Sequence, residues 1–287
     1  MKLYTFSVQP AQAGTPLNAL ARKALPQVPE RCLRTAFDQR DVKMNGVRVP
    51  RDTLAQAGAE IKIYLSDDCP TQSPEILYED AQLLVVQKPV GISCEVDAHG
   101  GLTLGEWLMQ QEGKRFTQTP MPCHRLDNQT DGLLLMAKDP SALLYMQQAF
   151  RERQVHKKYV CLVRGTPEPP EAMRTAYLCK DAQRARVQVH ETPSPGALTI
   201  RTGYRVLSAG EIARLEITLL TGRTHQIRAH MAFLGHPLLG DDLYGDRAFN
   251  RAHHARRLML TATELTFSVE GAFAYLNAMH FQIQPKF

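Results

Sequence analysis

The sequence predicts an α+β protein: a mixed, largely antiparallel sheet with flanking helices, preceded by a small N-terminal α/β module. Strand-like segments follow one another between residues 156 and 219 with no helical pattern between them, an order typical of antiparallel sheets. Residues 66–74, Ser-Asp-Asp-Cys-Pro-Thr-Gln-Ser-Pro, have the composition of a linker. We therefore expect a domain at 1–66, a linker at 67–74 and a second domain at 75–287.

The N-terminal module is expected to contain a strand, two helices, a hairpin and a last strand. Thr15 and Pro16 stand where the N-cap and the first residue of a helix belong. Asn45-Gly46 has the composition of a two-residue hairpin turn. The expected elements are strand Lys2–Val8, a helix from Pro16 to Leu25, helix Glu30–Gln39, hairpin Val42–Val49 and strand Glu60–Leu65.

The basic surplus of the chain lies in this module. Residues 1–65 contain ten Lys and Arg against five Asp and Glu, and the remaining 24 and 24 cancel, so this part accounts for the net charge of +5. Concentrated positive charge is typical of a nucleic-acid-binding surface, although a solvated basic face gives the same count. Phosphate contacts, which set register and affinity, are expected from Arg31, Arg34, Arg40, Lys43 and Arg48.

The larger domain shows strand patterns and a few helical ones. Pro89 ends a strand, because it has no N–H to give to a ladder, and Asp139-Pro140 starts a helix as cap and first residue. Trp107, the only tryptophan, is expected in the core. The expected elements are strands Ile76–Asp80, Leu83–Gln87, Leu133–Ala137, His156–Val163, Arg174–Leu178, Ala185–His190, Leu198–Leu207 and Ile212–Leu219, helices Thr103–Gln111 and Asp139–Arg153, and one helix starting within Gly222–His230.

The stretch from Cys123 to Asp139 contains the most informative acid. Asp127 follows the basic pair His124-Arg125 and precedes the turn Asp131-Gly132 and a short apolar run. It is therefore expected on a loop that enters a buried strand, a setting typical of catalytic groups. On spacing alone, an aspartate that only shapes the turn is the more frequent case.

Several motifs, in a fixed order, resemble those of the RluA-type RNA pseudouridine synthases. His124-Arg125-Leu126-Asp127, followed by Thr130 and Gly132, is similar to the signature H-R-L-D-x-x-T-S-G of that family. Hairpin Val42–Val49 and its neighbours resemble the S4 RNA-binding domain. The other matching segments are Lys88-Pro89-Val90-Gly91, Lys157-Lys158-Tyr159, Gly222-Arg223-Thr224-His225-Gln226-Ile227-Arg228-Ala229-His230, Gly235-His236-Pro237 and Gly240-Asp241.

The resemblance implies the fold of these enzymes and the conversion of uridine in ribosomal or transfer RNA to pseudouridine, with no cofactor. Asp127 would be the nucleophile, acting at C1′ or through an elimination that leaves a glycal. Tyr159 would stack on the everted base and help remove the C5 proton. Arg228 would hold Asp127 ionised through a forked hydrogen bond. The residues expected to bind RNA are Lys88, His124, Arg125, Leu126, Thr130, Lys157, Arg223, His225 and Gln226.

The chain departs from the family pattern at two positions. Asp131 stands where the family has serine, and Thr261 stands where it has the histidine of Leu-His-Ala. If Asp131 faces Asp127, its charge raises the free-energy cost of ionising the nucleophile. One alternative is therefore an RNA-binding protein that keeps the fold without catalysis. A glycoside hydrolase with Asp127 and Asp131 as paired carboxylates leaves the basic module and the arginines near Arg228 without a use.

Composition favours a reduced, cytoplasmic protein, with a monomer as the expected state. The six cysteines form no C-x-x-C pair, and the N-terminus shows no signal-peptide pattern. No apolar run approaches the roughly 20 residues that span a bilayer. His225 and His230 are five residues apart and lack the i, i+4 spacing of helical metal ligands, so no metal is expected.

Overall fold

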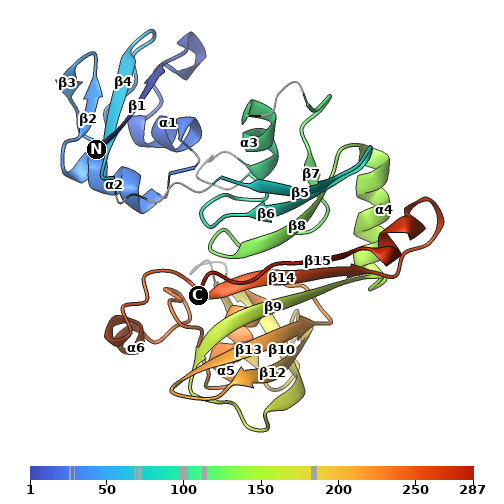
Figure 1. Cartoon of the computed structure of the whole chain (residues 1–287). Coiled ribbons are helices and arrows are strands. Elements are labelled where there is room, and N and C mark those ends of the chain that lie inside the picture. The colour runs from blue at the N-terminus through green and yellow to red at the C-terminus, as the bar shows by residue number, and fades with distance from the viewer. Residues whose placement is uncertain are drawn as a thin grey trace.

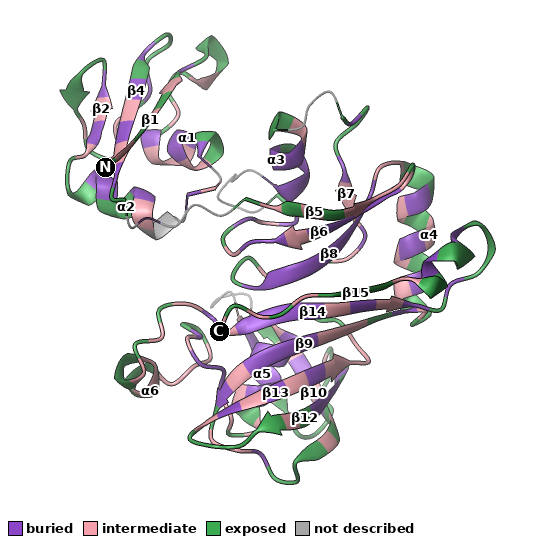
Figure 2. Ribbon diagram, in the orientation of Figure 1, coloured by how far each residue is buried: buried purple, intermediate pink, exposed green. Residues whose placement is uncertain are grey.

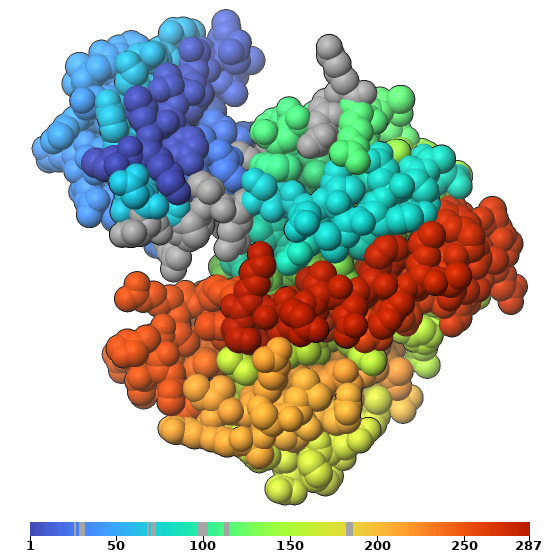
Figure 3. All heavy atoms as spheres, viewed as in Figure 1, coloured from blue at the N-terminus to red at the C-terminus, as the bar shows by residue number. Residues whose placement is uncertain are grey.

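The strands of the protein form two sheets (Figure 1). Residues 2–65 build a four-stranded sheet, and the strands from residue 75 onward build an 11-stranded sheet. Figure 3 shows the N-terminal residues as a lobe beside the rest of the chain. Part of the predicted linker lies outside the described residues. The structure, a computed structural model, describes residues 1–25, 27–28, 30–67, 69, 73–96, 103–111, 115–181 and 186–287.

The small sheet has the order β1-β4-β2-β3, and its two α-helices pack on one face. Leu20 and Phe37, one from each helix, share a hydrophobic cluster with the inward side chains of the strands. Asn45 and Gly46 have φ angles of 50° and 83°, as a type I′ turn requires, so the predicted hairpin is confirmed. The elements are β1 (Lys2–Ser7), η1 (Pro10–Gln12), α1 (Leu17–Ala24), α2 (Glu30–Asp38), β2 (Val42–Met44), β3 (Val47–Arg48) and β4 (Glu60–Leu65).

The other face of this sheet carries a row of cations. Lys43 pairs with Lys62 on β4 and with Arg48 on β3, and directly paired residues of antiparallel strands point to the same face. The neighbouring positions in β2 and β4 alternate with them and are buried against the helices. Lys62 was not predicted to bind phosphate. Of the other predicted residues, Arg34 and Arg40 are exposed, and the side chain of Arg31 lies outside the described part of the chain.

The large sheet is mixed and largely antiparallel, as predicted. Its order is β11-β10-β12-β13-β9-β14-β8-β6-β5, with β15 on β14 and β7 on β8. Among the ladders described, only that between β8 and β14 is parallel. The strands are β5 (Glu75–Glu79), β6 (Leu83–Lys88), β7 (Met121–Pro122), β8 (Asp131–Ala137), β9 (Val155–Arg164), β10 (Glu171–Asp181), β11 (Arg186–His190), β12 (Leu198–Ser208), β13 (Ile212–Leu219), β14 (Leu260–Phe267) and β15 (His280–Gln282).

Helices cover both faces of the large sheet around β8. The side chains of β8 alternate between two hydrophobic clusters, with Leu134 in the cluster of α3 and α5 and Leu135 in the cluster of α4 and η2. Burial on both faces explains the continuous apolar run of this strand, and Figure 2 shows β8 buried along its length. Trp107 is in the core, as predicted. The helices are α3 (Leu104–Gln111), α4 (Pro140–Arg151), α5 (Gln226–Phe233), α6 (Arg247–Ala252) and η2 (Gly271–Ala278).

The sequence patterns located most of these elements but not all of their bounds. Asp139 caps α4, accepting hydrogen bonds from two backbone N–H groups, and Pro140 is the first helical residue, as predicted. Helix α1 begins one residue late, because Pro16 is its N-cap. Ala185, the predicted start of a strand, lies outside the described residues. The elements that were not predicted are β7, β14, β15, α6 and the two 3-10 helices η1 and η2.

Candidate active site

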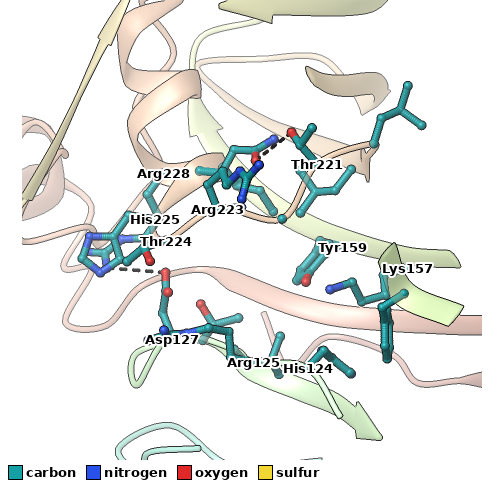
Figure 4. A pocket seen from close by; sticks show the side chains of 18 of the residues that line it. His124, Arg125, Asp127, Lys157, Tyr159, Thr221, Arg223, Thr224, His225 and Arg228 are labelled. Atoms are coloured by element: carbon teal, nitrogen blue, oxygen red, sulfur yellow. Dashed lines mark hydrogen bonds and ion pairs between the residues drawn. The ribbon is translucent and has the colours of Figure 1, made fainter. Parts of the chain in front are cut away.

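Three segments of the chain meet around a cavity of about 530 Å³. They are the loop before β8 (residues 124–130), the turn from α4 into β9 (150–159) and the end of β13 with the start of α5 (219–228). Figure 4 shows side chains of these segments pointing into the same space. Among the described residues that line the cavity, Asp127 is the only acidic one.

Asp127 lies on the loop that enters β8, as predicted. Its side chain is 17% exposed, and its Oδ2 is 3.9 Å from Nη1 of Arg228. The loop is fixed by its backbone: Thr130 N–H donates to the Asp127 carbonyl at 3.0 Å, and Gly91 N–H donates to the Asn128 carbonyl at 2.8 Å. The carboxylate is therefore held at the cavity by a rigid turn and faces a guanidinium.

Arg228 makes its forked hydrogen bond with Asp241 rather than with Asp127. Its Nε and Nη2 donate to the two oxygens of Asp241 at 2.7 and 2.8 Å, and both residues are almost fully buried. Burial lowers the pKa of Arg228, but the hydrogen bonds and charge of Asp241 outweigh burial and raise it. The prediction that Arg228 makes a forked hydrogen bond with Asp127 is wrong, because only its remaining nitrogen, Nη1, faces that carboxylate.

Tyr159 lies on β9 and lines the cavity, with 4% of its surface exposed. Burial raises the pKa of its phenol, and the nearby charge of Asp127 raises it further. The hydroxyl is therefore protonated at neutral pH, and a protonated phenol is a weak base. This environment favours a role for Tyr159 as a ring that stacks on the uracil over a role as the group that removes the C5 proton.

Two residues predicted to bind RNA, Lys88 and Gln226, are buried and make hydrogen bonds within the protein. Lys88 is 0% exposed and does not line the cavity. Its ammonium donates to the carbonyls of Pro89, Ile92 and Asn128 at 3.0, 2.9 and 3.4 Å, and burial lowers its pKa to about 8. Gln226 lines the cavity but is 2% exposed, and its amide makes several hydrogen bonds within the protein. Its partners are Thr221, the N–H of Arg223, the carbonyl of Arg201 and Thr202.

His124 also has a structural contact. Its Nε2 accepts a hydrogen bond from Leu135 N–H at 3.1 Å, and its ring packs on Phe150 with centroids 4.6 Å apart. Burial lowers the pKa of His124 well below the usual range, and the charge of Lys157 lowers it further. A neutral ring with one nitrogen engaged is a poor phosphate ligand. Of the two roles expected of His124 from the sequence, a phosphate contact or support of the everted base, this environment favours the second.

A cationic rim surrounds the cavity. Arg125 is exposed and lies 3.3 Å from Glu95, a pair that is more than half exposed on both sides. Leu126 and Thr130 line the wall, both buried. The basic run around the α4–β9 turn was not singled out from the sequence, although four cations within eight residues were a visible signal. The cationic residues of the rim are Arg125, Arg151, Arg153, His156 (when protonated), Lys157 and Arg223.

His225 is the N-cap of α5 in the left-handed conformation, with a φ of 53°. Its Nδ1 lies 3.0 Å from the hydroxyl of Tyr244, and that hydroxyl accepts a hydrogen bond from Val187 N–H. The tyrosine proton is then directed to Nδ1, which places the imidazole hydrogen on Nε2. Burial lowers the pKa of His225, so a neutral ring with a fixed tautomer lines the cavity beside Asp127.

Asp131 does not line the cavity. Its Oδ1 accepts a hydrogen bond from Thr261 at 2.5 Å, and its Oδ2 lies 3.4 Å from Nη1 of Arg257. The positions of the two departures from the family pattern are therefore in contact with each other. The charged group that faces Asp131 is the guanidinium of Arg257, not the carboxylate of Asp127. The condition under which Asp131 was expected to impair the nucleophile, that the two carboxylates face each other, is therefore not met.

No group of three potential metal ligands occurs within the described residues. The same part of the chain has no helix long and apolar enough to cross a membrane. None of the six cysteines takes part in a disulfide bond. The described residues that line the cavity offer one carboxylate, a buried tyrosine and a surrounding set of cations.

Fold and site together define the class of protein. A family model described as RNA pseudouridylate synthase matches residues 82–233, more than half of the chain, and the chain belongs to that family. The match contains Asp127, Tyr159 and Arg228. It is an RNA pseudouridine synthase by family.

Individual relatives share this length and fold. The chain is 31% identical to "Ribosomal large subunit pseudouridine synthase C" of Vibrio vulnificus (strain CMCP6), over 93% of this chain and 89% of the relative. It is 30% identical to the protein of the same name from Escherichia coli (strain K12), over 91% and 87%. Among solved structures, Human RNA Pseudouridylate Synthase Domain Containing 4 superimposes with a TM-score of 0.59 at 26% identity, over 73% of this chain and 88% of that one.

A charge in the cavity wall gives a testable pH dependence. Burial lowers the pKa of Lys157 to about 8, and an amine is charged below its pKa. RNA affinity should therefore fall roughly three- to tenfold between pH 7 and pH 9, the effect of one phosphate contact. Titration of Kd against pH measures it. Lys157→Arg should remove most of this decrease, because a guanidinium stays charged; an equally steep decrease in that variant would assign the titration to another group.

Proposed function

We propose that the protein converts specific uridines of large-subunit ribosomal RNA to pseudouridine, with Asp127 as the nucleophile. The observation that carries the proposal is one carboxylate faced by the Arg228 guanidinium. The other described residues that line the cavity are cations, neutral polar groups and apolar side chains. The names of the relatives support ribosomal RNA as the substrate. Transfer RNA is the second candidate from the sequence, and the relatives reported above do not favour it.

The reaction conserves atoms. The N1–C1′ bond of a uridine breaks, the base turns, a C5–C1′ bond forms, C5 loses a proton and N1 gains one. No oxidant, reductant or energy source enters this balance. Asp127 either bonds to C1′ or removes a ribose proton in an elimination that leaves a glycal. Arg228 keeps Asp127 ionised in both routes, because a guanidinium beside a carboxylate favours its charged form.

The cavity suits a base that has left its helix. A uracil must be everted to reach a recessed carboxylate, which costs a few kcal/mol unless the nucleotide already lies in a loop. The Tyr159 ring offers a stacking surface of the kind worth about 1–3 kcal/mol per base. Arg125, Lys157 and Arg223 lie on the rim, where the sugar-phosphate backbone of the everted nucleotide would pass.

The proposal is tested by mapping pseudouridines in ribosomal and transfer RNA from cells with and without this gene. We expect a small number of sites in large-subunit ribosomal RNA to be lost without it and restored by the intact gene. Loss of sites only in transfer RNA would overturn the substrate class. An unchanged pseudouridine map would overturn the proposed function as a whole.

The N-terminal module is proposed to hold RNA through phosphate contacts on its cationic row. The double variant Lys43→Gln/Arg48→Gln should weaken RNA binding and reduce the slope of log K against log[salt] by up to about 1.8, since each phosphate contact contributes roughly 0.7–0.9. Filter binding from 50 to 300 mM salt measures the slope. The double variant Lys180→Gln/Arg205→Gln removes the same charge from strands β10 and β12 of the large sheet and should leave the slope unchanged. Equal slopes in the two variants would exclude the row from RNA binding.

A further inference from the structure

The groups of the candidate active site come from two parts of the large sheet. We call β5 to β8 the first half and β9 to β15 the second half. Asp127 precedes β8, whereas Tyr159 lies on β9 and Arg228 lies on α5, which contacts β11 and β12. The distance between the carboxylate and its two partners therefore depends on how the halves are joined.

Within the described residues, one short ladder joins the halves. Strands β8 and β14, side by side in Figure 1, form two pairs, Asp131 with Thr261 and Gly132 with Ala262. Further along, β8 pairs with β7 and β14 pairs with β15. Gly132 has a φ of 117°, and an added Cβ would lie 2.2 Å from the Ala262 carbonyl oxygen. The strands approach each other most closely at this one point.

The Asp131 side chain crosses the ladder at that point. It is 9% exposed, and both oxygens face groups of the second half. Thr261 donates to Oδ1 at 2.5 Å, and Nη1 of Arg257 lies 3.4 Å from Oδ2. Arg257 is itself held through Nη2, which donates to the Lys286 carbonyl at 3.2 Å. A charge-assisted contact thus reinforces the junction of the halves.

The short turn formed by residues 127–131 couples the position of Asp127 to that of Asp131. Thr130, beside Asp131, donates its N–H to the Asp127 carbonyl. The Asn128 carbonyl accepts from the buried Lys88 ammonium, and Lys88 pairs with Gly132 in the β6–β8 ladder. A shift of Asp131 relative to β14 therefore also shifts Asp127 relative to Arg228.

We propose that Asp131 is a positioning residue whose contacts with Thr261 and Arg257 set the separation of Asp127 from Arg228 and Tyr159. This inference rests on the proposed function of the cavity. The 3.9 Å contact between Asp127 and Arg228 spans the two halves, and misplacement of a reacting group by 1 Å can lower a rate about 100-fold. The departures at 131 and 261 then act as one matched pair.

The test compares Asp131→Asn, Thr261→Val and the double variant in the full-length protein. Each single variant should lower the single-turnover rate of pseudouridine formation by about tenfold or more while RNA Kd stays within about threefold, because phosphate contacts are untouched. The double variant should be no slower than the slower single variant, since both changes act on the same hydrogen bond between Asp131 and Thr261, one by removing the acceptor's charge and the other by removing the donor. Thr261→Ser keeps the hydroxyl that donates to Asp131 and should therefore retain the wild-type rate. Additive losses, or unchanged rates, would overturn the proposal.

A second measurement does not require activity. Amide hydrogen exchange without RNA should accelerate at residues 127–132 and 260–262 in Asp131→Asn and Thr261→Val. It should not accelerate there in Asp246→Asn, a control that removes a carboxylate whose hydrogen bonds, to Arg164, Ala248 and Phe249, all lie within the second half. If exchange is faster in the two variants but the wild-type protein makes no pseudouridine, the proposed function is rejected and the role of Asp131 at the junction is kept. An active wild type with unchanged exchange in both variants would reject the junction alone.

Discussion

Replacing Asp127 with asparagine is expected to abolish pseudouridine formation. An amide of the same size can neither bond to C1′ nor remove a ribose proton, and loss of a nucleophile costs about 10⁴-fold or more in rate. RNA affinity should change only a few-fold, because the rim cations are untouched. Chromatography of nucleosides after single-turnover reactions measures the rate, and filter binding measures Kd.

Asp80→Asn is the matched control for that change. Asp80 accepts hydrogen bonds from Gln82 N–H and Leu83 N–H and does not line the cavity, so its loss should leave the rate within about twofold. A rate in Asp127→Asn within tenfold of wild type would remove Asp127 from the chemistry. A loss of RNA affinity as large as the loss of rate would show that Asp127 serves binding.

Asp241→Asn is expected to have the largest effect on stability. Asp241 is 0% exposed and accepts two hydrogen bonds from Arg228 and two from backbone N–H groups. Removing its charge leaves a buried guanidinium without its counter-ion, and breaking such a pair costs about 3–5 kcal/mol. The free energy of unfolding in urea measures this. The freed guanidinium should also turn toward Asp127, lowering the single-turnover rate by at least about tenfold.

The neighbouring acid provides the comparison. Asp242 also lies 3.4 Å from Arg228, but its side chain is 80% exposed, and exposed ion pairs contribute about 0–1 kcal/mol. Asp242→Asn should therefore leave the free energy of unfolding within about 1 kcal/mol of wild type. Equal effects of the two variants would mean that burial of the Arg228–Asp241 pair is not what stabilises the site.

Features set by neighbours in the sequence were predicted well. The Asn45-Gly46 turn, the Asp139 cap with Pro140 and the loop position of Asp127 all depend on contacts within a few residues. Strand β8 was recognisable because burial on both faces leaves only apolar residues.

Features set by distant contacts were missed. Strand β14, Leu-Thr-Ala-Thr-Glu-Leu-Thr-Phe, mixes polar with apolar residues, so its sequence does not show that it lies between β8 and β9 in the middle of the sheet. The partner of Arg228 was assigned to Asp127, although Asp241 holds it, since only the fold places Asp241 behind the guanidinium. For Lys88 and Gln226, the motif indicated that the residues matter but not whether they contact RNA or backbone carbonyls.

The central claim is that a carboxylate at position 127, beside Arg228, rearranges a uridine held in this cavity. Large-subunit ribosomal RNA carrying tritium at C5 of uridine tests it most directly, because forming the C5–C1′ bond releases that hydrogen. We expect the wild-type protein to release one tritium per pseudouridine formed and Asp127→Asn to release none while still binding the RNA. Tight RNA binding by the wild type without tritium release, or equal release by Asp127→Asn, would contradict the claim.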